Sequence, residues 1–224
     1  MTRWATFDCY GTLVDWDGGI GAELARLWPD ADAPVLLARY HEIEPRVQAG
    51  AALPYRHVLR ESLRLLADHE GLPLATAEED ALADALPRWP VFPEVPASLR
   101  ALRGRGWRLA VLSNTDPDLL AASLDAIGVP FDVAITAAEA RSYKPAHGHW
   151  ERFFAETDAN RAGHVHVAAS AYHDLGPAAE LGLAAVWINR LGEESDLPRA
   201  AELPDLAELP DTLERLVPAA TLSG

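Results

Sequence analysis

The chain has 224 residues, of which 49% are hydrophobic and 24% are charged, a balance that argues against a disordered or fibrous protein and predicts a buried core. Nineteen Lys and Arg against thirty-four Asp and Glu give a formal charge of −15, which disfavours nucleic acid and anionic membranes as partners. Cys9 is the only cysteine, so no intrachain disulfide is expected, and without a targeting pattern or a long apolar run a cytoplasmic location is expected.

The first predicted element in chain order is a strand over residues 4–8. Gly11 follows it and permits a sharp turn, because glycine has no side chain to restrict its backbone. Side chains alternate along a strand, so Cys9 is expected to point away from Asp8 and to fill a small buried space. The strand therefore presents Asp8 at its carboxyl end.

A helical pattern then extends from residue 18 to about residue 90. Apolar residues recur with the spacing of one helix face, and prolines separate the runs. The predicted helices cover residues 20–28, 35–47, 55–69 and 76–86. Because no clear strand interrupts them, we expect an inserted helical cap domain over residues 15–92.

Helices and short apolar strands alternate after Pro93. Such a βαβ series predicts an α/β fold, a three-layer α/β sandwich around a parallel, Rossmann-like sheet, in a core domain of residues 1–14 and 93–224. The tail over residues 202–216 is expected to add a short edge strand, a proline turn and a final helix. The other predicted helices are 95–103, 117–127, 145–156 and 174–181, and the strands are 108–112, 132–136, 164–168 and 184–188.

Reactive side chains follow the predicted strands at the edge where such sheets bind their ligands. Asp8 is a candidate nucleophile, since a carboxylate can form a covalent intermediate that water then hydrolyses. Alone, an Asp after a strand is commonly a turn former or a helix cap. Ser113 and Asn114 offer a hydroxyl and an amide to a substrate, and the same pair can cap the helix that follows.

Four motifs occur in order along the chain: FDCYGTLVD at residues 7–15, LSN at 112–114, Lys144-Pro145, and SAYHD at 170–174. Together they resemble the haloacid dehalogenase (HAD) superfamily, and most closely its L-2-haloacid dehalogenase branch, over almost the whole chain. The resemblance implies a HAD-type sheet with a helical cap, and a hydrolase that uses Asp8 as its nucleophile. Members of this branch often form homodimers, so a homodimer is also an expectation.

The resemblance assigns roles around Asp8. Thr12 is expected to orient the nucleophile, and Lys144 to lie beside it and keep the carboxylate ionised. Asp174 is expected to orient or activate the water that hydrolyses the ester. His173 is a candidate proton carrier near Asp174, with a hydrogen-bonded structural role as an equal alternative.

The expected substrate is a short 2-haloacid, a small organic anion. Ser113 and the N–H groups of nearby loops would hold its carboxylate, and Ser170 is a further candidate contact. Arg39 and Asn114 would receive the departing halide, because a guanidinium keeps its charge; Arg46 is the alternative to Arg39.

An aromatic residue is also expected near the substrate. Trp150 falls where related dehalogenases carry one, although a place in the hydrophobic core is equally expected.

Tyr10 separates this chain from the phosphatases of the superfamily, which usually carry a second Asp two residues after the nucleophile. A phenol, with an ordinary pKa of about 10, is a poor acid and base there and is expected to line an apolar pocket. The fourth motif offers only Asp174, too few oxygen ligands for Mg²⁺. We therefore expect a metal-independent enzyme with no cofactor.

The fourth loop departs from the branch, because Ala169 and Ala171 stand where well-matched haloacid dehalogenases carry Ser and Asn. Three alternatives to a haloacid dehalogenase therefore stay open. They are a Mg²⁺-dependent phosphatase of a small metabolite, a hydrolase acting on another carbon centre such as a strained cyclic imino acid, and a non-catalytic binding protein.

Overall fold

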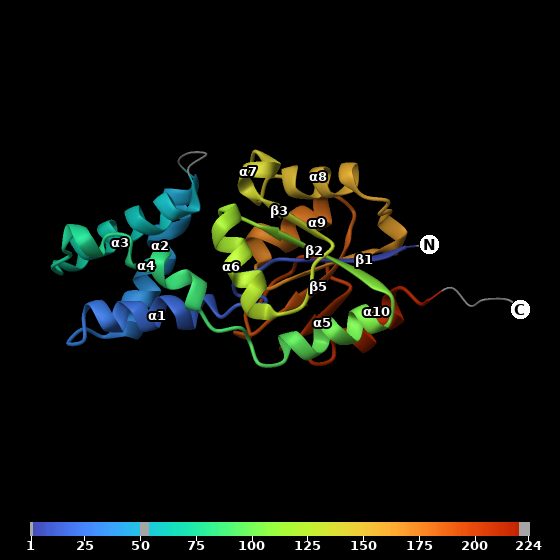
Figure 1. Ribbon diagram of the computed structural model, residues 1–224, viewed down its shortest axis with the longest axis horizontal. Coiled ribbons are helices and arrows are strands. Elements are labelled where there is room, and N and C mark those ends of the chain that lie inside the picture. The colour runs from blue at the N-terminus through green and yellow to red at the C-terminus, as the bar shows by residue number, and fades with distance from the viewer. Residues whose placement is uncertain (1, 50–53, 220–224) are drawn as a thin grey trace, which may run out of the picture.

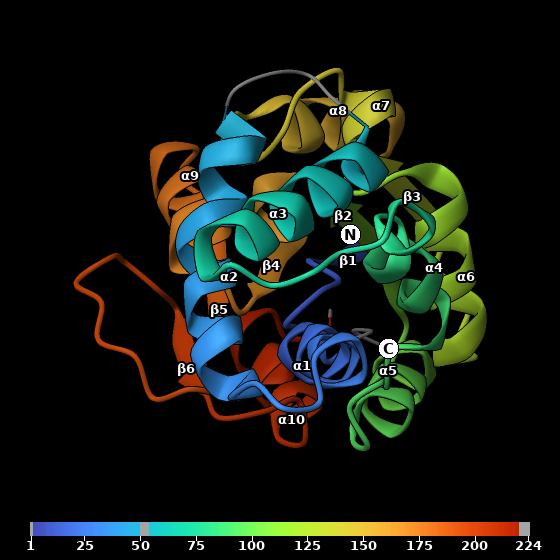
Figure 2. The same cartoon turned by 90° about the vertical axis from the view of Figure 1, so that its left-hand side faces the viewer.

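A six-stranded parallel sheet forms the centre of the computed structural model, which describes residues 2–49 and 54–219. The strands lie in the order β3-β2-β1-β4-β5-β6 (Figures 1 and 2). The chain moves outward from β1 in one direction and then in the other, so a topological switch point, where such sheets bind ligands, lies beside β1. The strands are β1 (Arg3–Phe7), β2 (Trp107–Ser113), β3 (Val133–Thr136), β4 (His164–Ala168), β5 (Ala184–Ile188) and β6 (Ala201–Leu203). The predicted α/β sandwich is confirmed.

Helices cover both faces of the sheet because alternate side chains of each strand point to opposite sides. Ala5 and Phe7 of β1 belong to a buried cluster shared with one set of helices, whereas Trp4 belongs to a second cluster shared with another set. Cys9 is fully buried in the first cluster, as predicted. The first set is α5 (Val95–Gly104), α6 (Pro117–Ile127) and α10 (Leu209–Leu216); the second is α8 (Gly148–Glu156) and α9 (Gly176–Glu180).

Four further helices form a group at one end of the molecule, beyond the carboxyl ends of the strands (Figures 1 and 2). Helix α3 buries Leu59, Leu63 and Leu66, whose spacing places them on one helix face. We propose that residues 15–92 form a cap domain on a core of residues 1–14 and 93–224. The helices are α1 (Trp16–Leu27), α2 (Ala33–Ala49), α3 (Tyr55–Glu70) and α4 (Ala81–Ala85).

Some predicted helices differ in detail. The one expected over residues 76–86 is a 3₁₀ turn at Thr76–Glu78, the short α4, and a second 3₁₀ turn at Leu86–Arg88. The one expected over residues 145–156 begins only at Gly148. Residues 144–147 form a turn instead, where the Asn114 side chain binds the backbone N–H of Lys144.

A short helix α7 (Ala137–Ala140), which was not predicted, follows β3. It begins with a capping box between Thr136 and Glu139. A π-helical turn at Ala171–Leu175 precedes α9 and carries the fourth motif. Among the described residues, no helix has the length and apolar character needed to span a membrane.

Candidate active site

Asp8 is the first residue beyond β1, at the centre of the sheet. Its backbone N–H donates to Val167 O of β4 at 3.1 Å, which continues the strand pairing up to the carboxylate. Oδ2 accepts a hydrogen bond from Thr12 Oγ1 at 2.8 Å, and Oδ1 accepts one from Lys144 Nζ at 2.8 Å. Thr12 in turn accepts from the backbone N–H of Ala169. Both oxygens of Asp8 are therefore oriented, as predicted for Thr12 and Lys144.

Lys144 is the only lysine in the chain, and it is buried between two carboxylates. Its Nζ lies 2.8 Å from Asp8 Oδ1 and 2.7 Å from Asp174 Oδ1. Burial alone lowers the pKa of this ammonium, but Asp174 and Asp8 outweigh burial, so its pKa lies above the ordinary value. Lys144 is thus a fixed cation that holds the two carboxylates together.

Asn114 holds the backbone of Lys144 on both sides. Its Oδ1 accepts from Lys144 N at 2.6 Å, and its Nδ2 donates to Lys144 O at 2.9 Å and lies 3.5 Å from Gln48 Oε1. The amide lines the cavity and holds the backbone of Lys144 in place. The predicted role of Asn114 in receiving the halide stays a prediction.

Asp174 is completely buried, and only one of its oxygens is engaged. Oδ1 accepts from Lys144 Nζ and from His166 Nε2, the latter at 2.9 Å, whereas Oδ2 has no hydrogen-bond partner among the described residues. Burial raises the pKa of Asp174, but Lys144 and His166 more than offset this, and the pKa is well below the ordinary value. Asp174 is therefore an ionised carboxylate with one oxygen available.

A buried network beneath Asp174 was not anticipated from the sequence. Thr6 Oγ1 lies 2.8 Å from His166 Nδ1 and 2.8 Å from His164 Nε2. All three residues are on adjacent strands, and strand alternation points Thr6 to the same side as Asp8. Thr6 pairs with His166 in the register of β1 and β4. Strand alternation from Asp8 to Thr6, and from Thr6 across to His166, could therefore have identified His166 as a residue near the site.

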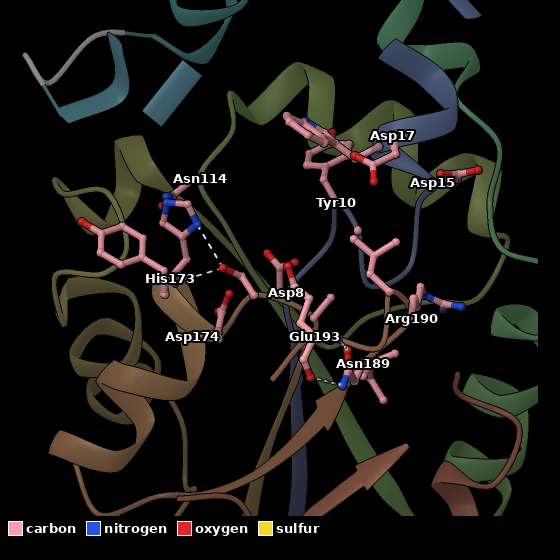
Figure 3. A pocket seen from close by; sticks show the side chains of 18 of the residues that line it. Asp8, Tyr10, Asp15, Asp17, Asn114, His173, Asp174, Asn189, Arg190 and Glu193 are labelled. Atoms are coloured by element: carbon pink, nitrogen blue, oxygen red, sulfur yellow. Dashed lines mark hydrogen bonds between the residues drawn. The ribbon is translucent and has the colours of Figure 1, made fainter. Parts of the chain in front are cut away.

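A cavity of about 920 Å³ opens above these residues, between the sheet edge and the α1–α4 group. Figure 3 shows Asp8 between His173 and Asp174 on one side and Tyr10 and Arg190 on the other. The predicted site residues that line it are Asp8, Tyr10, Ser113, Asn114, Lys144, Ser170, His173 and Asp174. Thr12 lies directly behind Asp8 and is fully buried.

Tyr10 forms part of an aromatic wall of this cavity, as predicted. Its ring stacks on Tyr55 with centroids 6.4 Å apart, and its hydroxyl lies 3.0 Å from Ser123 Oγ. Burial raises the pKa of the phenol well above its ordinary value. Tyr10 therefore stays neutral and contributes an aromatic surface, not an acid or a base.

Ser113 offers an unused hydroxyl at the cavity wall. It is buried, and its Oγ has no hydrogen-bond partner among the described residues. Ser170 Oγ, in contrast, accepts from the His173 backbone N–H at 3.0 Å and begins the π-helical turn. His173 Nε2 lies 3.1 Å from Gln48 Oε1, and burial lowers the pKa of this imidazole. Gln48 of α2, which the sequence reasoning missed, therefore connects the cap helices to the fourth loop.

Two predicted substrate contacts lie outside the cavity. Arg39 is on the surface of α2, where its guanidinium pairs with Glu42 at 2.6 Å and Glu70 at 3.3 Å, so the halide role assigned to it is corrected. Its alternative, Arg46, is exposed and does not line the cavity either. Trp150 is fully buried with its ring 5.2 Å from that of His166, because the apolar face of α8 packs on the sheet. Trp150 is thus a core residue.

Arg190, another missed residue, does line the cavity (Figure 3). It follows β5, and its guanidinium lies 3.5 Å over the ring of Phe92. Nη2 donates to Thr12 O at 2.8 Å and to Glu94 Oε1 at 2.6 Å. Because ligands bind where parallel strands end, its place directly after a predicted strand could have identified it.

The arrangement of the acidic side chains bears on whether the site could hold a metal ion. Among the residues that the structure describes, no group of three or more His, Cys, Asp or Glu side chains is arranged to hold a metal ion. Between Asp8 and Asp174, the position of positive charge is taken by the ammonium of Lys144.

Comparisons with known proteins find relatives over most of the chain. A family model described as haloacid dehalogenase-like hydrolase matches residues 2–182. The (S)-2-haloacid dehalogenase of Pseudomonas sp. strain YL is 30% identical over 201 residues, which cover 83% of this chain and 82% of that protein. Haloacetate dehalogenase H-2 of Moraxella sp. strain B is 29% identical over 192 residues, covering 83% and 85%. A solved L-2-haloacid dehalogenase structure, 27% identical, superposes with a TM-score of 0.84 over 95% of this chain and 99% of its own.

Proposed function

Because this chain belongs to the haloacid dehalogenase-like hydrolases, we propose that it hydrolyses the carbon–halogen bond of short 2-haloacids with Asp8 as nucleophile and without a metal. The supporting observation is the bridge from Asp8 through Lys144 to Asp174, at 2.8 and 2.7 Å. It places an oriented carboxylate, a fixed cation and a second carboxylate at the base of one cavity.

The first step is attack of an Asp8 oxygen on the halogen-bearing carbon. A carbon–oxygen bond forms, the carbon–halogen bond breaks, and the halide leaves with the bonding electrons. Thr12 and Lys144 hold the carboxylate in one orientation before the attack. The free hydroxyl of Ser113 donates to the substrate carboxylate.

The second step is hydrolysis of the aspartyl ester. A water molecule attacks the carboxyl carbon of Asp8, and the 2-hydroxyacid leaves as its oxygen takes a proton. The water oxygen stays on Asp8, and one proton is released overall. Oδ2 of Asp174, which has no partner among the described residues, orients this water, while Lys144 stabilises the charge that develops on the ester oxygen.

The charges of the site residues support a reaction without a metal ion. A phosphatase uses Mg²⁺ to offset the negative charge of its phosphate and carboxylates, whereas here Lys144 already pairs with both Asp8 and Asp174. Tyr10, with its pKa raised by burial, is too weak an acid to protonate a leaving group near neutral pH. A phosphatase activity is therefore less well supported.

The test is halide release from chloroacetate, bromoacetate, fluoroacetate and 2-chloropropionate in the presence of a chelator, beside p-nitrophenyl phosphate with Mg²⁺. We expect halide release that survives the chelator and is abolished in Asp8→Asn. In a single turnover in ¹⁸O-water, the label should enter Asp8, because the water attacks the ester at that residue. Label found only in the hydroxyacid, or phosphatase activity alone, would overturn the proposal.

A further inference from the structure

The cavity is strongly acidic for an enzyme expected to bind an anion. Eight carboxylate side chains line it, against one lysine and one arginine. Both cations are already paired: Lys144 with Asp8 and Asp174, and Arg190 with Glu94 at 2.6 Å. A substrate carrying only negative charge would meet unfavourable electrostatic potential over much of this surface.

Glu44 of α2 is the carboxylate that stands out. It lines the cavity, yet the residue is only 6% exposed. Its Oε1 accepts one long hydrogen bond, from Gln48 Nε2 at 3.4 Å, and no hydrogen bond from a described residue reaches Oε2. Burial raises the pKa of Glu44 to about 7, against an opposing influence of His41. Glu44 forms no ion pair with a described residue, and a buried unpaired carboxylate is costly, so a cation that entered the cavity would relieve that cost.

Aromatic side chains share the cavity with Glu44. Trp16 and Tyr55 line the same cavity, with Trp16 Nε1 donating to Tyr55 Oη at 3.0 Å. After burial, the charge of Glu44 is the largest influence that raises the pKa of Tyr55. Tyr55 also stacks on Tyr10, two residues from the nucleophile. Aromatic faces beside a carboxylate are the combination that binds organic ammonium groups.

The contacts of Gln48 show where Glu44 lies relative to Asp8. Its side chain contacts Glu44, Asn114 and His173, at 3.4, 3.5 and 3.1 Å. Asn114 holds Lys144, and His173 precedes Asp174 in the chain, so Glu44 is separated from the reactive end of the cavity by one side chain.

We propose that Glu44, Trp16 and Tyr55 bind a positively charged ammonium group of the substrate, so that the preferred substrates are short haloacids bearing an ammonium group at the end opposite the reactive carbon. The inference rests on the proposed function, because it takes Asp8 as the nucleophile that attacks that carbon. Ser113 and Glu44 would then bind opposite charges of one zwitterion.

The first test compares two substrates of the same shape. 2-Chloro-4-(trimethylammonio)butyrate carries the cation and cannot cyclise, and 2-chloro-5,5-dimethylhexanoate replaces the nitrogen with carbon. We expect kcat/KM to be at least about tenfold higher for the ammonium compound. This preference should fall several-fold in Glu44→Gln and persist in Glu42→Gln, an exposed control on the same helix. Equal rates in the wild type, or a preference unchanged in Glu44→Gln, would overturn the inference.

A second test needs no turnover and separates this inference from the proposed function. Calorimetric titration with 4-(trimethylammonio)butyrate and with 5,5-dimethylhexanoate measures binding alone. Tighter binding of the ammonium ligand, weakened in Glu44→Gln and retained in Asp8→Asn, supports the ammonium site even if no halide is released from any haloacid. Halide release from 2-chloropropionate together with equal binding of the two ligands supports the proposed function and refutes the ammonium site.

Discussion

His166 Nε2 lies 2.9 Å from Oδ1 of Asp174, and this contact supports the carboxylate from within the sheet. The fourth loop carries Ala169 and Ala171, which have no polar side-chain groups to support Asp174 from the loop itself. The histidine, held by Thr6, offers that support from a neighbouring position on β4. Asp174 is thus held by a residue of the strand below it.

His166→Leu should slow hydrolysis of the aspartyl ester roughly a hundredfold, because Asp174 would keep only its contact with Lys144 and would be less firmly oriented toward the water. Mass spectrometry of quenched reactions should then show the ester accumulating on Asp8. His166→Gln, which retains a donor, should recover part of the rate. His164→Leu is the control, because His164 contacts Thr6 and not Asp174; an equal loss of rate in that variant would indicate a general packing effect.

Lys144→Met should abolish halide release and destabilise the fold by about 3–5 kcal/mol, because two buried carboxylates lose their shared cation. Both effects are measurable, by halide assay and by denaturant unfolding. Lys144→Met combined with Asp174→Asn should regain part of the stability, since one buried charge is removed, but none of the activity. If the single variant keeps more than a tenth of wild-type activity, the role of Lys144 is contradicted.

Glu44 should make the stability of the protein depend on pH. The pKa of Glu44 is about 7 in the folded state against 4.5 for an unperturbed side chain, so between these values only the folded state holds the proton. The free energy of unfolding should therefore fall as pH rises through this window, by about 3 kcal/mol in total, and remain lower above it.

Glu44→Gln should remove this contribution. Its stability relative to the wild type should increase from pH 4.5 to about pH 7.5, measured by urea unfolding at each pH. Glu42→Gln, on an exposed part of α2, is the matched control and should show no such increase. Parallel pH curves for the wild type and Glu44→Gln would contradict the elevated pKa.

Arg39 and Arg190 should differ sharply when each is replaced by alanine. Arg39 pairs with carboxylates at the surface, so Arg39→Ala should keep activity within about twofold of the wild type. Arg190→Ala loses its contacts with Thr12, Glu94 and Phe92 and should lower stability by about 2 kcal/mol. Its kcat should fall as well, since Thr12 orients Asp8. A large loss of activity in Arg39→Ala alone would restore the prediction that Arg39 receives the departing halide.

The sequence by itself was sufficient to predict the parallel α/β sheet, the helical segment after β1, and the group of Asp8, Thr12, Lys144 and Asp174. Strand and helix periodicities are local properties, and the carboxyl ends of parallel strands meet at one edge whatever the details of packing. Asp8 and Asp174, which follow β1 and β4, are brought together by this rule, whereas Thr12 and Lys144 were assigned from the resemblance of the motifs to the family.

Only the tertiary structure decided which side chains of the helices and strands face the cavity. Arg39 and Glu44 lie on the same helix, but the rotation of α2 against its neighbours turns the arginine outward and the glutamate inward. His166 and Trp150 are likewise assigned by packing across the sheet. A helix or strand pattern specifies which residues share a face, whereas contacts between segments far apart in the chain determine what that face meets.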